Sequence, residues 1–250
     1  MKETKIMKVF EQYIKKFNMN KNNTKCVYFH CIKTMDLCKN IASVLGIFTP
    51  EEIVVCELIG LFHDISLFEN KDNNFTLDTK EDCSKRSIEI LFDKDGLMRK
   101  ITEDTQYDEI IKIAIYCQNK SGLPSKIDDK TLHYCKVLRD AHILDSFRIV
   151  LNYPYIDMHI DNYPNNIIYE NFKKFKKMYH TEDENDADAA IIVLSQIFGL
   201  NYLYSYSLLN EEQFVNKVVN SFIYKDKNIM KFFKQINMVL NNYISRKIGG

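Results

Sequence analysis

Apolar residues recur every three or four positions through most of this 250-residue chain, a spacing typical of α-helices that bury one face. The N-terminal segment shows the pattern clearly, with Ile6, Phe10, Ile14 and Phe17 on one helical face. The chain has only 7 Gly and 4 Pro residues, and no run combines strand-like alternation with hairpin signals. The sequence therefore predicts an all-α fold with short connections.

Polar or turn-forming segments separate the stretches that carry this helical pattern. The predicted helices cover residues 4–18, 24–46, 50–64, 82–94, 107–119, 130–150, 166–179, 187–208, 211–223 and 226–246. Gly46 is expected to end the second helix, and Thr49-Pro50 supplies an N-cap and a first-turn proline for the third. Residues 65–81 are predicted to form a polar loop, and residues 151–165 are the best internal break. We predict one domain over residues 1–250, with a core at about 24–150 and the C-terminal helices, about 166–246, packing on it.

The charge balance and the cysteines limit the class of protein. With 34 basic and 34 acidic residues the net charge is zero, which argues against a broad nucleic-acid surface but leaves room for a local phosphate pocket. Seven Cys residues occur without a C-x-x-C pair, as expected for reduced thiols in the cytoplasm. No apolar run approaches 18 residues and no signal segment opens the chain, so we expect a cytoplasmic protein without a membrane span.

The dipeptide His63-Asp64 closes the apolar run of residues 54–62 and is the best candidate for metal chemistry. A carboxylate buried at the end of such a helix needs a partner, and a cation can be that partner. His30 and Asp140 lie in other predicted helices, so two imidazoles and two carboxylates could bind one divalent metal such as Mn, Fe, Co, Ni or Zn. A metal-bound water whose pKa is lowered to about 7 could then attack phosphorus. Taken singly, each of these residues is more often a core or surface residue than a ligand.

The order His30, His63-Asp64, Asp140 resembles the HD-domain superfamily of metal-dependent phosphohydrolases. Further segments are similar to a bacterial branch of it: residues 57–70 to an HDIGRFEQ-like stretch, 107–119 to its YDEIIKKAIYYHN helix, 137–147 to its IIRDADKLDIF helix, and 191–245 to its C-terminal helices. The resemblance covers about residues 24–246. It implies an HD-type helical bundle with additional C-terminal helices, in which His30, His63, Asp64 and Asp140 are the metal ligands.

The chain also departs from that branch. Cys83 and Gln118 stand where the branch has two histidines that help hold a second metal, so the comparison predicts one metal at most. Gln118 would be a weak neutral ligand, and Cys83 would favour Zn. Ser66-Leu67 replaces a Gly-Arg pair and removes a guanidinium that could bind phosphate.

Several further residues are candidates for the chemistry. Glu69 matches the branch's Glu and could act as a general base or orient the attacking water, although a solvated loop carboxylate is an equal alternative. His142 stands where the branch has the second acid of its DAD motif and could act as a general acid, yet a helix turns position i+2 away from the face of Asp140. Three basic residues could neutralise a phosphate or simply carry surface charge: Lys120, Lys126 and Arg139.

The sequence thus predicts a one-metal phosphohydrolase that acts on a small phosphoester such as a nucleotide, with Asp64 and Glu69 as catalytic residues. The first alternative is a degenerate HD domain that binds a ligand or partner without catalysis, motivated by Cys83, Gln118 and Leu67. The second is a helical interaction protein whose four candidate ligands lie apart. The aromatic stretch 198–206 is expected to serve helix packing or a dimer face, so a homo-oligomer stays open.

Overall fold

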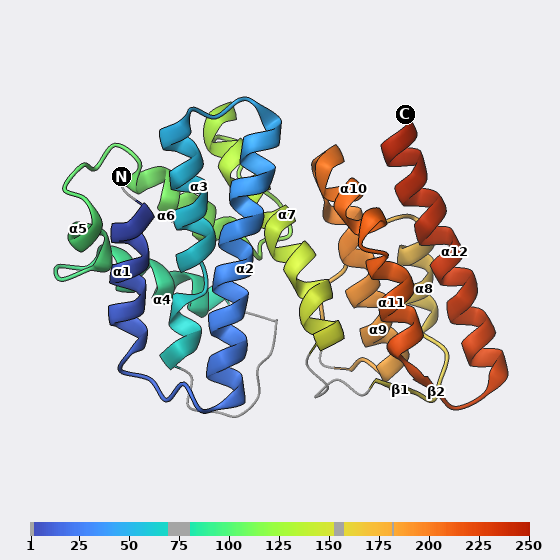
Figure 1. The fold of residues 1–250 in the computed structure, drawn as a ribbon. Helices are drawn as coiled ribbons and strands as arrows, with labels where there is room; N and C mark the ends of the chain where they lie inside the picture. The colour runs from blue at the N-terminus through green and yellow to red at the C-terminus, as the bar shows by residue number, and fades with distance from the viewer. Residues whose placement is uncertain (1–2, 70–80, 153–157, 182) are drawn as a thin grey trace. The chain divides into compact units, whose positions relative to one another are not determined.

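The structure, a computed structural model, describes residues 3–69, 81–152, 158–181 and 183–250, and the side chains of residues 81 and 82 lie outside this description. These residues form twelve α-helices, two short 3-10 helices and one pair of two-residue strands (Figure 1). The predicted all-α fold is confirmed. The chain divides into two compact units, Met1–Asp145 and Ser146–Gly250, and the boundary lies inside helix α7 (Asp129–Asn152), close to the predicted end of the core at residue 150.

The first unit contains six α-helices, one 3-10 helix and the first part of α7. Their bounds are α1 (Glu3–Ile14), α2 (Asn22–Leu45), α3 (Pro50–Phe62), η1 (Ile65–Glu69), α4 (Glu81–Phe92), α5 (Leu97–Ile101) and α6 (Asp108–Cys117). Gly46 ends α2 in a left-handed conformation at φ 65°, as the sequence predicts. The short helix α5 was not predicted, and the expected loop at residues 65–81 begins with η1 while residues 70–80 lie outside the described part.

Helix α3 lies in the interior of the first unit because its sequence is apolar on nearly every face. It begins with a complete capping box, in which the Thr49 side chain accepts from Glu52 N and the Glu52 side chain accepts from Thr49 N. All eight residues from Val55 to Phe62 are buried. Because α3 ends at Phe62 with His63 as its C-cap, His63 and Asp64 are buried in the interior of the unit.

Helices α2 and α3 run side by side and touch most closely at Gly60 (Figure 1). A Cβ atom on Gly60 would lie 2.8 Å from Thr34 O and 2.9 Å from Met35 Cα. Only a residue without a side chain allows this approach. It brings the end of α3 close to the residues of α2 that precede Thr34, and His30 is one of them.

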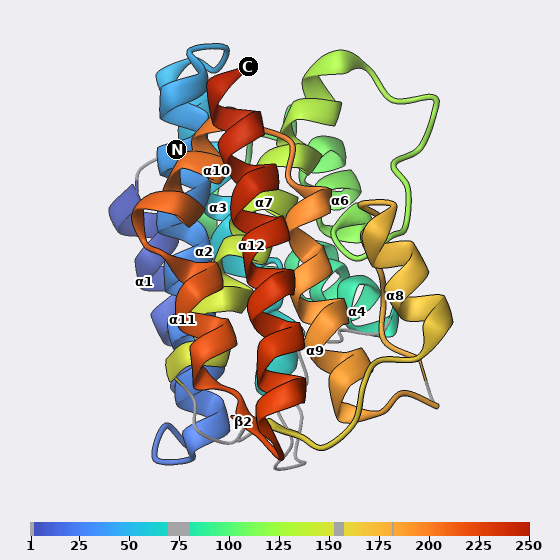
Figure 2. The ribbon, with the colours of Figure 1, turned by 90° about the vertical axis from the view of Figure 1, so that its right-hand side faces the viewer.

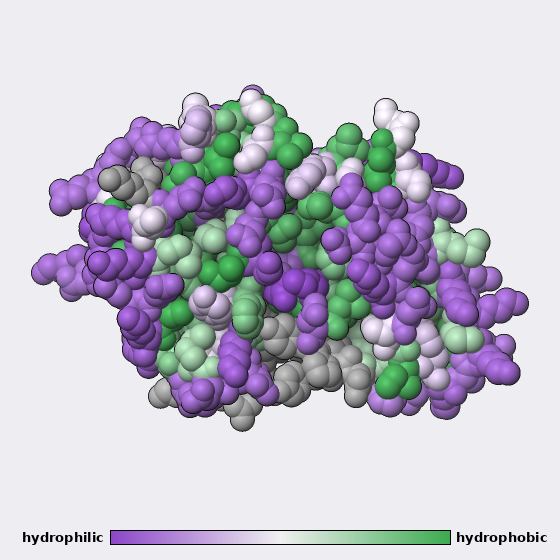
Figure 3. All heavy atoms as spheres, in the orientation of Figure 1, coloured by the Kyte–Doolittle hydropathy of each residue, from purple (hydrophilic) through white to green (hydrophobic). Residues whose placement is uncertain are grey.

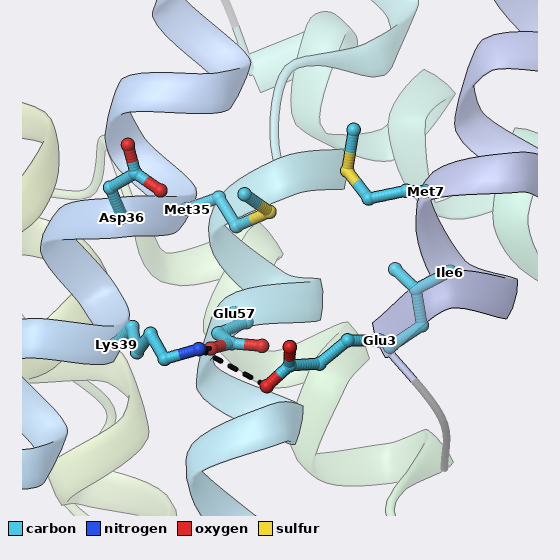
Figure 4. Close-up of a pocket in the computed structure, with 7 residues that line it drawn as sticks. All are labelled: Glu3, Ile6, Met7, Met35, Asp36, Lys39 and Glu57. Carbon is cyan, nitrogen blue, oxygen red and sulfur yellow. Dashed lines mark hydrogen bonds and ion pairs between the residues drawn. The ribbon is translucent and has the colours of Figure 1, made fainter.

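Lys39 of α2 joins α1 to this helix pair through two carboxylates. Lys39 Nζ donates to Glu3 Oε1 at 3.1 Å and forms an ion pair with Glu57 on α3 (Figure 4). Ile6, Met7 and Met35 complete the wall of a small cavity of about 90 Å³ beside these groups. Both carboxylates therefore have a cationic partner from the chain itself, and this cluster serves to hold α1 in place.

The second unit contains the remaining helices and the strand pair. Their bounds are β1 (His159–Ile160), α8 (Asn166–Lys173), α9 (Asp186–Ser195), η2 (Gln196–Gly199), α10 (Leu203–Glu211), α11 (Phe214–Ser221), β2 (Ile223–Tyr224) and α12 (Lys227–Gly249). The strands pair in parallel, with His159 opposite Ile223. Helices α10 and α11 pack along α12, whose buried face carries Phe233, Ile236 and Leu240 (Figure 2).

Two predicted helices of the second unit are shorter than expected. The helix predicted at 166–179 ends at Lys173, because Phe175 adopts a positive φ of 54°. The helix predicted at 187–208 is divided into α9, η2 and α10, since the chain becomes extended at Leu200, with φ −69° and ψ 144°. The strands were not predicted, because two residues are too few to show an alternating pattern.

The surface mixes polar and apolar residues. Hydrophilic residues predominate on the face drawn in Figure 3, and apolar residues are scattered among them. Exposed large apolar side chains are spread over several helices, with examples on α2, α8, α10 and α12: Phe29, Val44, Ile167, Leu203 and Met238. Within the described residues, no helix combines the length and the hydropathy needed to cross a bilayer.

A methyl group at Gly60 should force α2 and α3 apart, because two of the atoms it would meet belong to the α2 backbone. We expect Gly60→Ala to lower the free energy of unfolding by about 1–3 kcal/mol in urea denaturation followed by circular dichroism. Gly122→Ala is the matched control, since an added Cβ there meets nothing within 4 Å, and it should change stability by less than about 0.5 kcal/mol. Equal stabilities of the two variants would contradict the close approach of α2 and α3.

Candidate metal centre

Four side chains of the first unit converge in its interior: His30, His63, Asp64 and His142. Each offers one ligand atom, and these atoms all lie within 4.8 Å of one another. His30 comes from α2, His63 and Asp64 follow the end of α3, and His142 comes from α7. The first three are at most 1% exposed, while 12% of the His142 side chain is exposed, so His142 marks the side of the group nearest the solvent.

Hydrogen bonds to the outer nitrogens fix how two of the imidazoles face each other. His30 Nδ1 lies 2.6 Å from Asp145 Oδ2, and His63 Nδ1 lies 2.8 Å from the Gly60 carbonyl oxygen. An ionised carboxylate and a carbonyl can only accept, so both Nδ1 atoms carry a proton and donate. In the neutral rings each Nε2 is then a lone-pair donor to a cation, which is the arrangement by which carboxylates and carbonyls orient metal-binding histidines.

The two Nε2 atoms point at each other at 3.0 Å, and Asp64 Oδ2 lies 3.3 Å from each of them. Three lone-pair atoms this close repel one another unless a proton or a cation lies among them. Without a metal the proton fills this role. Burial lowers the pKa of His30, but hydrogen bonds to Asp145 and Asp64 outweigh this and raise it to about 9. Burial likewise disfavours ionised Asp64, yet the His63 and His30 rings hold its pKa well below the usual range.

A metal ion fits this donor set. An ion about 2.1 Å from two ligand atoms at a tetrahedral angle separates them by about 3.4 Å, close to the 3.0–3.3 Å between the His30, His63 and Asp64 atoms. The fourth atom, His142 Nε2, lies 3.8 Å from Asp64 Oδ2. Imidazole nitrogen and carboxylate oxygen are ligands that suit borderline divalent metals, and this donor set does not choose among them. The arrangement can therefore hold one divalent cation.

The structure places His142, and not the predicted ligand Asp140, in the converging group. A helix turns about 100° per residue, so positions 140 and 142 of α7 face nearly opposite directions and only one of them can point at His30 and His63. Asp140 is fully buried, and its charge helps to raise the pKa of the Cys38 thiol of α2, after burial itself and the neighbouring Cys56. The ligand atom within the converging group belongs to His142, and a ligand role of Asp140 stays a prediction.

Asp145 is a functional candidate that the sequence analysis missed. It lies three residues after His142, so the two share one face of α7, and its side chain is fully buried against His30. Two signals could have identified it: this i, i+3 spacing, and the aspartate at the same place in the similar IIRDADKLDIF helix.

The residues that depart from the branch pattern lie in different places. Gln118 is 3% exposed and its Nε2 donates to Asp64 Oδ1 at 2.7 Å, so it touches the site. Cys83 is not part of the converging group, and its backbone oxygen accepts from Ser66 Oγ at 2.9 Å. Leu67 is buried in η1. A thiolate ligand from Cys83 therefore does not enter the donor set described above.

Glu69, the predicted general base, is outside the converging group and bound by other side chains. Arg86 donates to it through Nε at 2.8 Å and Nη2 at 3.2 Å, and Tyr13 OH donates at 3.1 Å. Arg86 is the main cause that holds the pKa of Glu69 below its usual value. A carboxylate held in this way is a weak base, and it also links α1, η1 and α4.

Of the basic candidates, Arg139 is the one near the site. It precedes His142 by one helical turn, is 9% exposed, and donates through Nη2 to the Lys120 backbone oxygen at 2.5 Å. Lys120 Nζ lies 4.5 Å from the centre of the Tyr116 ring, and Lys126 is exposed. Arg139 thus holds a guanidinium beside the end of α6, on the same side of α7 as His142.

Comparison of the chain with protein-family models, curated proteins and solved structures finds no match.

Asp145 should strengthen metal binding by holding His30 with Nε2 turned inward. In Asp145→Asn the amide no longer requires a proton on His30 Nδ1, and the imidazole loses a charged acceptor that raises its basicity. We expect the affinity for Zn²⁺ or Co²⁺ to fall by about 10–100-fold in isothermal titration. Asp129→Asn, on the exposed first turn of the same helix, is the matched control and should leave the affinity unchanged. Equal affinities of Asp145→Asn and the wild type would exclude this role.

Proposed function

We propose that this chain is a metal-dependent phosphohydrolase that holds one divalent transition metal through His30, His63, Asp64 and His142. The observation that supports it most strongly is the convergence of these four side chains, three of them buried, with two imidazoles oriented by Asp145 and the Gly60 carbonyl. The resemblance of the His30, His63-Asp64 pattern to the HD-domain superfamily supports the reaction class. This resemblance rests on the sequence motifs alone.

A divalent cation held by His30, His63, Asp64 and His142 would supply Lewis-acid chemistry, polarising a phosphoryl oxygen and lowering the pKa of water near neutral pH. The chain's own residues supply the rest. Asp64 presents Oδ2 toward the imidazoles, and Arg139 offers a guanidinium one helical turn from His142 for the negative charge of a phosphate. Because His142 is the exposed member, we propose that the phosphoester enters from its side.

The substrate we propose is a small phosphoester such as a nucleotide. The net charge of the chain is zero, so it lacks the excess of basic residues that a polymeric nucleic acid requires. One buried arginine and a single cation suit a single phosphate group.

A second candidate function is binding of a metal and a ligand without turnover. The position of Glu69 favours it, because this carboxylate would first have to break its two hydrogen bonds to Arg86 before it could act as a base. In that case the metal centre would serve ligand recognition or stability.

The proposal predicts both bound metal and turnover. Purified protein loaded with Mn²⁺, Co²⁺, Ni²⁺ or Zn²⁺ should bind about one equivalent by elemental analysis and hydrolyse at least one member of a panel of nucleotides and other small phosphoesters. His142→Ala should weaken metal binding by more than about 100-fold, beyond the effect expected for an outer partner of a ligand. Asp140→Asn should keep the metal, since Asp140 is not one of the four converging residues.

His133→Gln, on the same helix as His142 but outside the group, is the matched histidine control and should keep both metal and activity. Stoichiometric metal without turnover of any phosphoester would favour the binding function over catalysis. Folded protein that binds none of the four metals would contradict both functions, and loss of metal in Asp140→Asn with retention in His142→Ala would restore Asp140 as the ligand.

A further inference from the structure

Gln118 is the residue of this site whose role the proposed function leaves open, and the inference drawn from it rests on that function. It is the C-cap of α6, where its backbone N–H lies 3.4 Å from Ile115 O. Its side chain is 97% buried and turns into the unit, where it meets Asp64. A glutamine this deeply buried is normally hydrogen-bonded at both ends of its amide.

The two oxygens of Asp64 have different partners. Oδ2 faces the imidazoles, at 3.3 Å from His30 Nε2 and His63 Nε2 and 3.8 Å from His142 Nε2. Oδ1 accepts from Gln118 Nε2 at 2.7 Å. The amide thus fixes the rotation of the carboxylate and keeps one oxygen turned toward the metal position.

The orientation of the Gln118 amide follows from these partners. An ionised carboxylate can only accept, so the amide nitrogen and not the oxygen must face Asp64. The same nitrogen lies 3.4 Å from Ser84 Oγ, which takes its second hydrogen. Both amide hydrogens are therefore used. The carbonyl oxygen Oε1 is buried and, among the described residues, meets no hydrogen-bond donor.

A buried carbonyl without a donor costs about 1–3 kcal/mol, so a donor that lies outside the described residues is expected beside it. Since Oε1 belongs to the amide that touches Asp64 Oδ1, this donor lies next to the metal centre. A water molecule is the smallest group that can donate to Oε1 and still reach the space between Asp64 and the imidazoles.

We propose that Gln118 is a positioning residue for the attacking water: its Nε2 holds Asp64, and its Oε1 accepts one hydrogen of a water molecule in the metal site. The amide is neutral at any pH relevant to the protein, so it orients the water and does not take its proton. With one hydrogen held by Oε1, a lone pair of the water is kept directed into the site, where the phosphorus of a phosphoester would lie.

The test compares Gln118→Met with the wild type in the Mn²⁺-loaded protein. Methionine has a similar length and cannot donate to Asp64 or accept from water. The Mn²⁺ dissociation constant should rise by no more than about 100-fold, as for Asp145→Asn, because Gln118 holds a ligand and is not one itself. The contribution of ordered water to solvent-proton relaxation by Mn²⁺ should fall by half or more, and kcat on any substrate found should fall by about 10–100-fold while KM stays within about threefold.

Two further variants test whether the effect comes from the acceptor oxygen of Gln118 and not from loss of a glutamine as such. Gln118→Glu keeps the side-chain length and an acceptor oxygen, so it should retain the relaxation signal within about twofold. Gln118→Leu, which also lacks a donor and an acceptor, takes the place of the methionine variant if that variant does not fold. Gln106→Met is the matched control, because its Nε2 also donates to an aspartate, Asp104 Oδ2 at 2.8 Å, but on the exposed surface. It should behave as the wild type.

Different outcomes would contradict the metal-dependent function and the role of Gln118. Wild-type protein that binds none of Mn²⁺, Co²⁺, Ni²⁺ and Zn²⁺ would overturn the proposed function. Wild-type binding with an unchanged relaxation signal in Gln118→Met would overturn only the role of Gln118. Loss of Mn²⁺ in Gln118→Met comparable to that in His142→Ala would also overturn it, because Gln118 would then be a ligand.

Discussion

The arrangement on which the rest of the first unit depends is the approach of two imidazole nitrogens, His30 Nε2 and His63 Nε2, to 3.0 Å beside the Asp64 carboxylate. Each ring is turned inward by an acceptor behind it, Asp145 in one case and the Gly60 carbonyl in the other. A fully buried set of lone pairs is stable only with a positive charge among them. The same buried charges that raise the pKa of His30 make the position attractive to a divalent cation.

The helices of the first unit create this arrangement through one close contact. Gly60 lets the α3 backbone approach α2 at Thr34, and its carbonyl oxygen accepts the hydrogen bond that orients His63 one turn later. The capping box at Thr49 fixes where α3 begins, and the apolar surface of α3 forces it into the interior. A single helix thus determines the depth of the site and the direction of one ligand, so the stability of the fold and the geometry of the site are coupled.

Much of this could be predicted from the sequence because it depends on local patterns. Helical periodicity and the capping signals located α2 and α3, and the end of an apolar helix indicated that His63-Asp64 is buried. The choice between Asp140 and His142 could not be made in this way, because both lie in a helix that is buried on several sides and its rotation depends on tertiary packing. Asp145 escaped notice for the same reason: its partner His30 is 115 positions away in the sequence.

The environment of Asp64 also bears on how many metals the site can hold. A carboxylate that bridges two cations through both oxygens offers one oxygen to each. Here Oδ2 faces the imidazoles, while Oδ1 accepts the N–H of Gln118 at 2.7 Å. The sequence resemblance predicts one metal at most because Gln118 stands where the similar branch has a histidine. The hydrogen bond agrees with that prediction, since the amide donates to the oxygen that such a bridge would offer to a second cation.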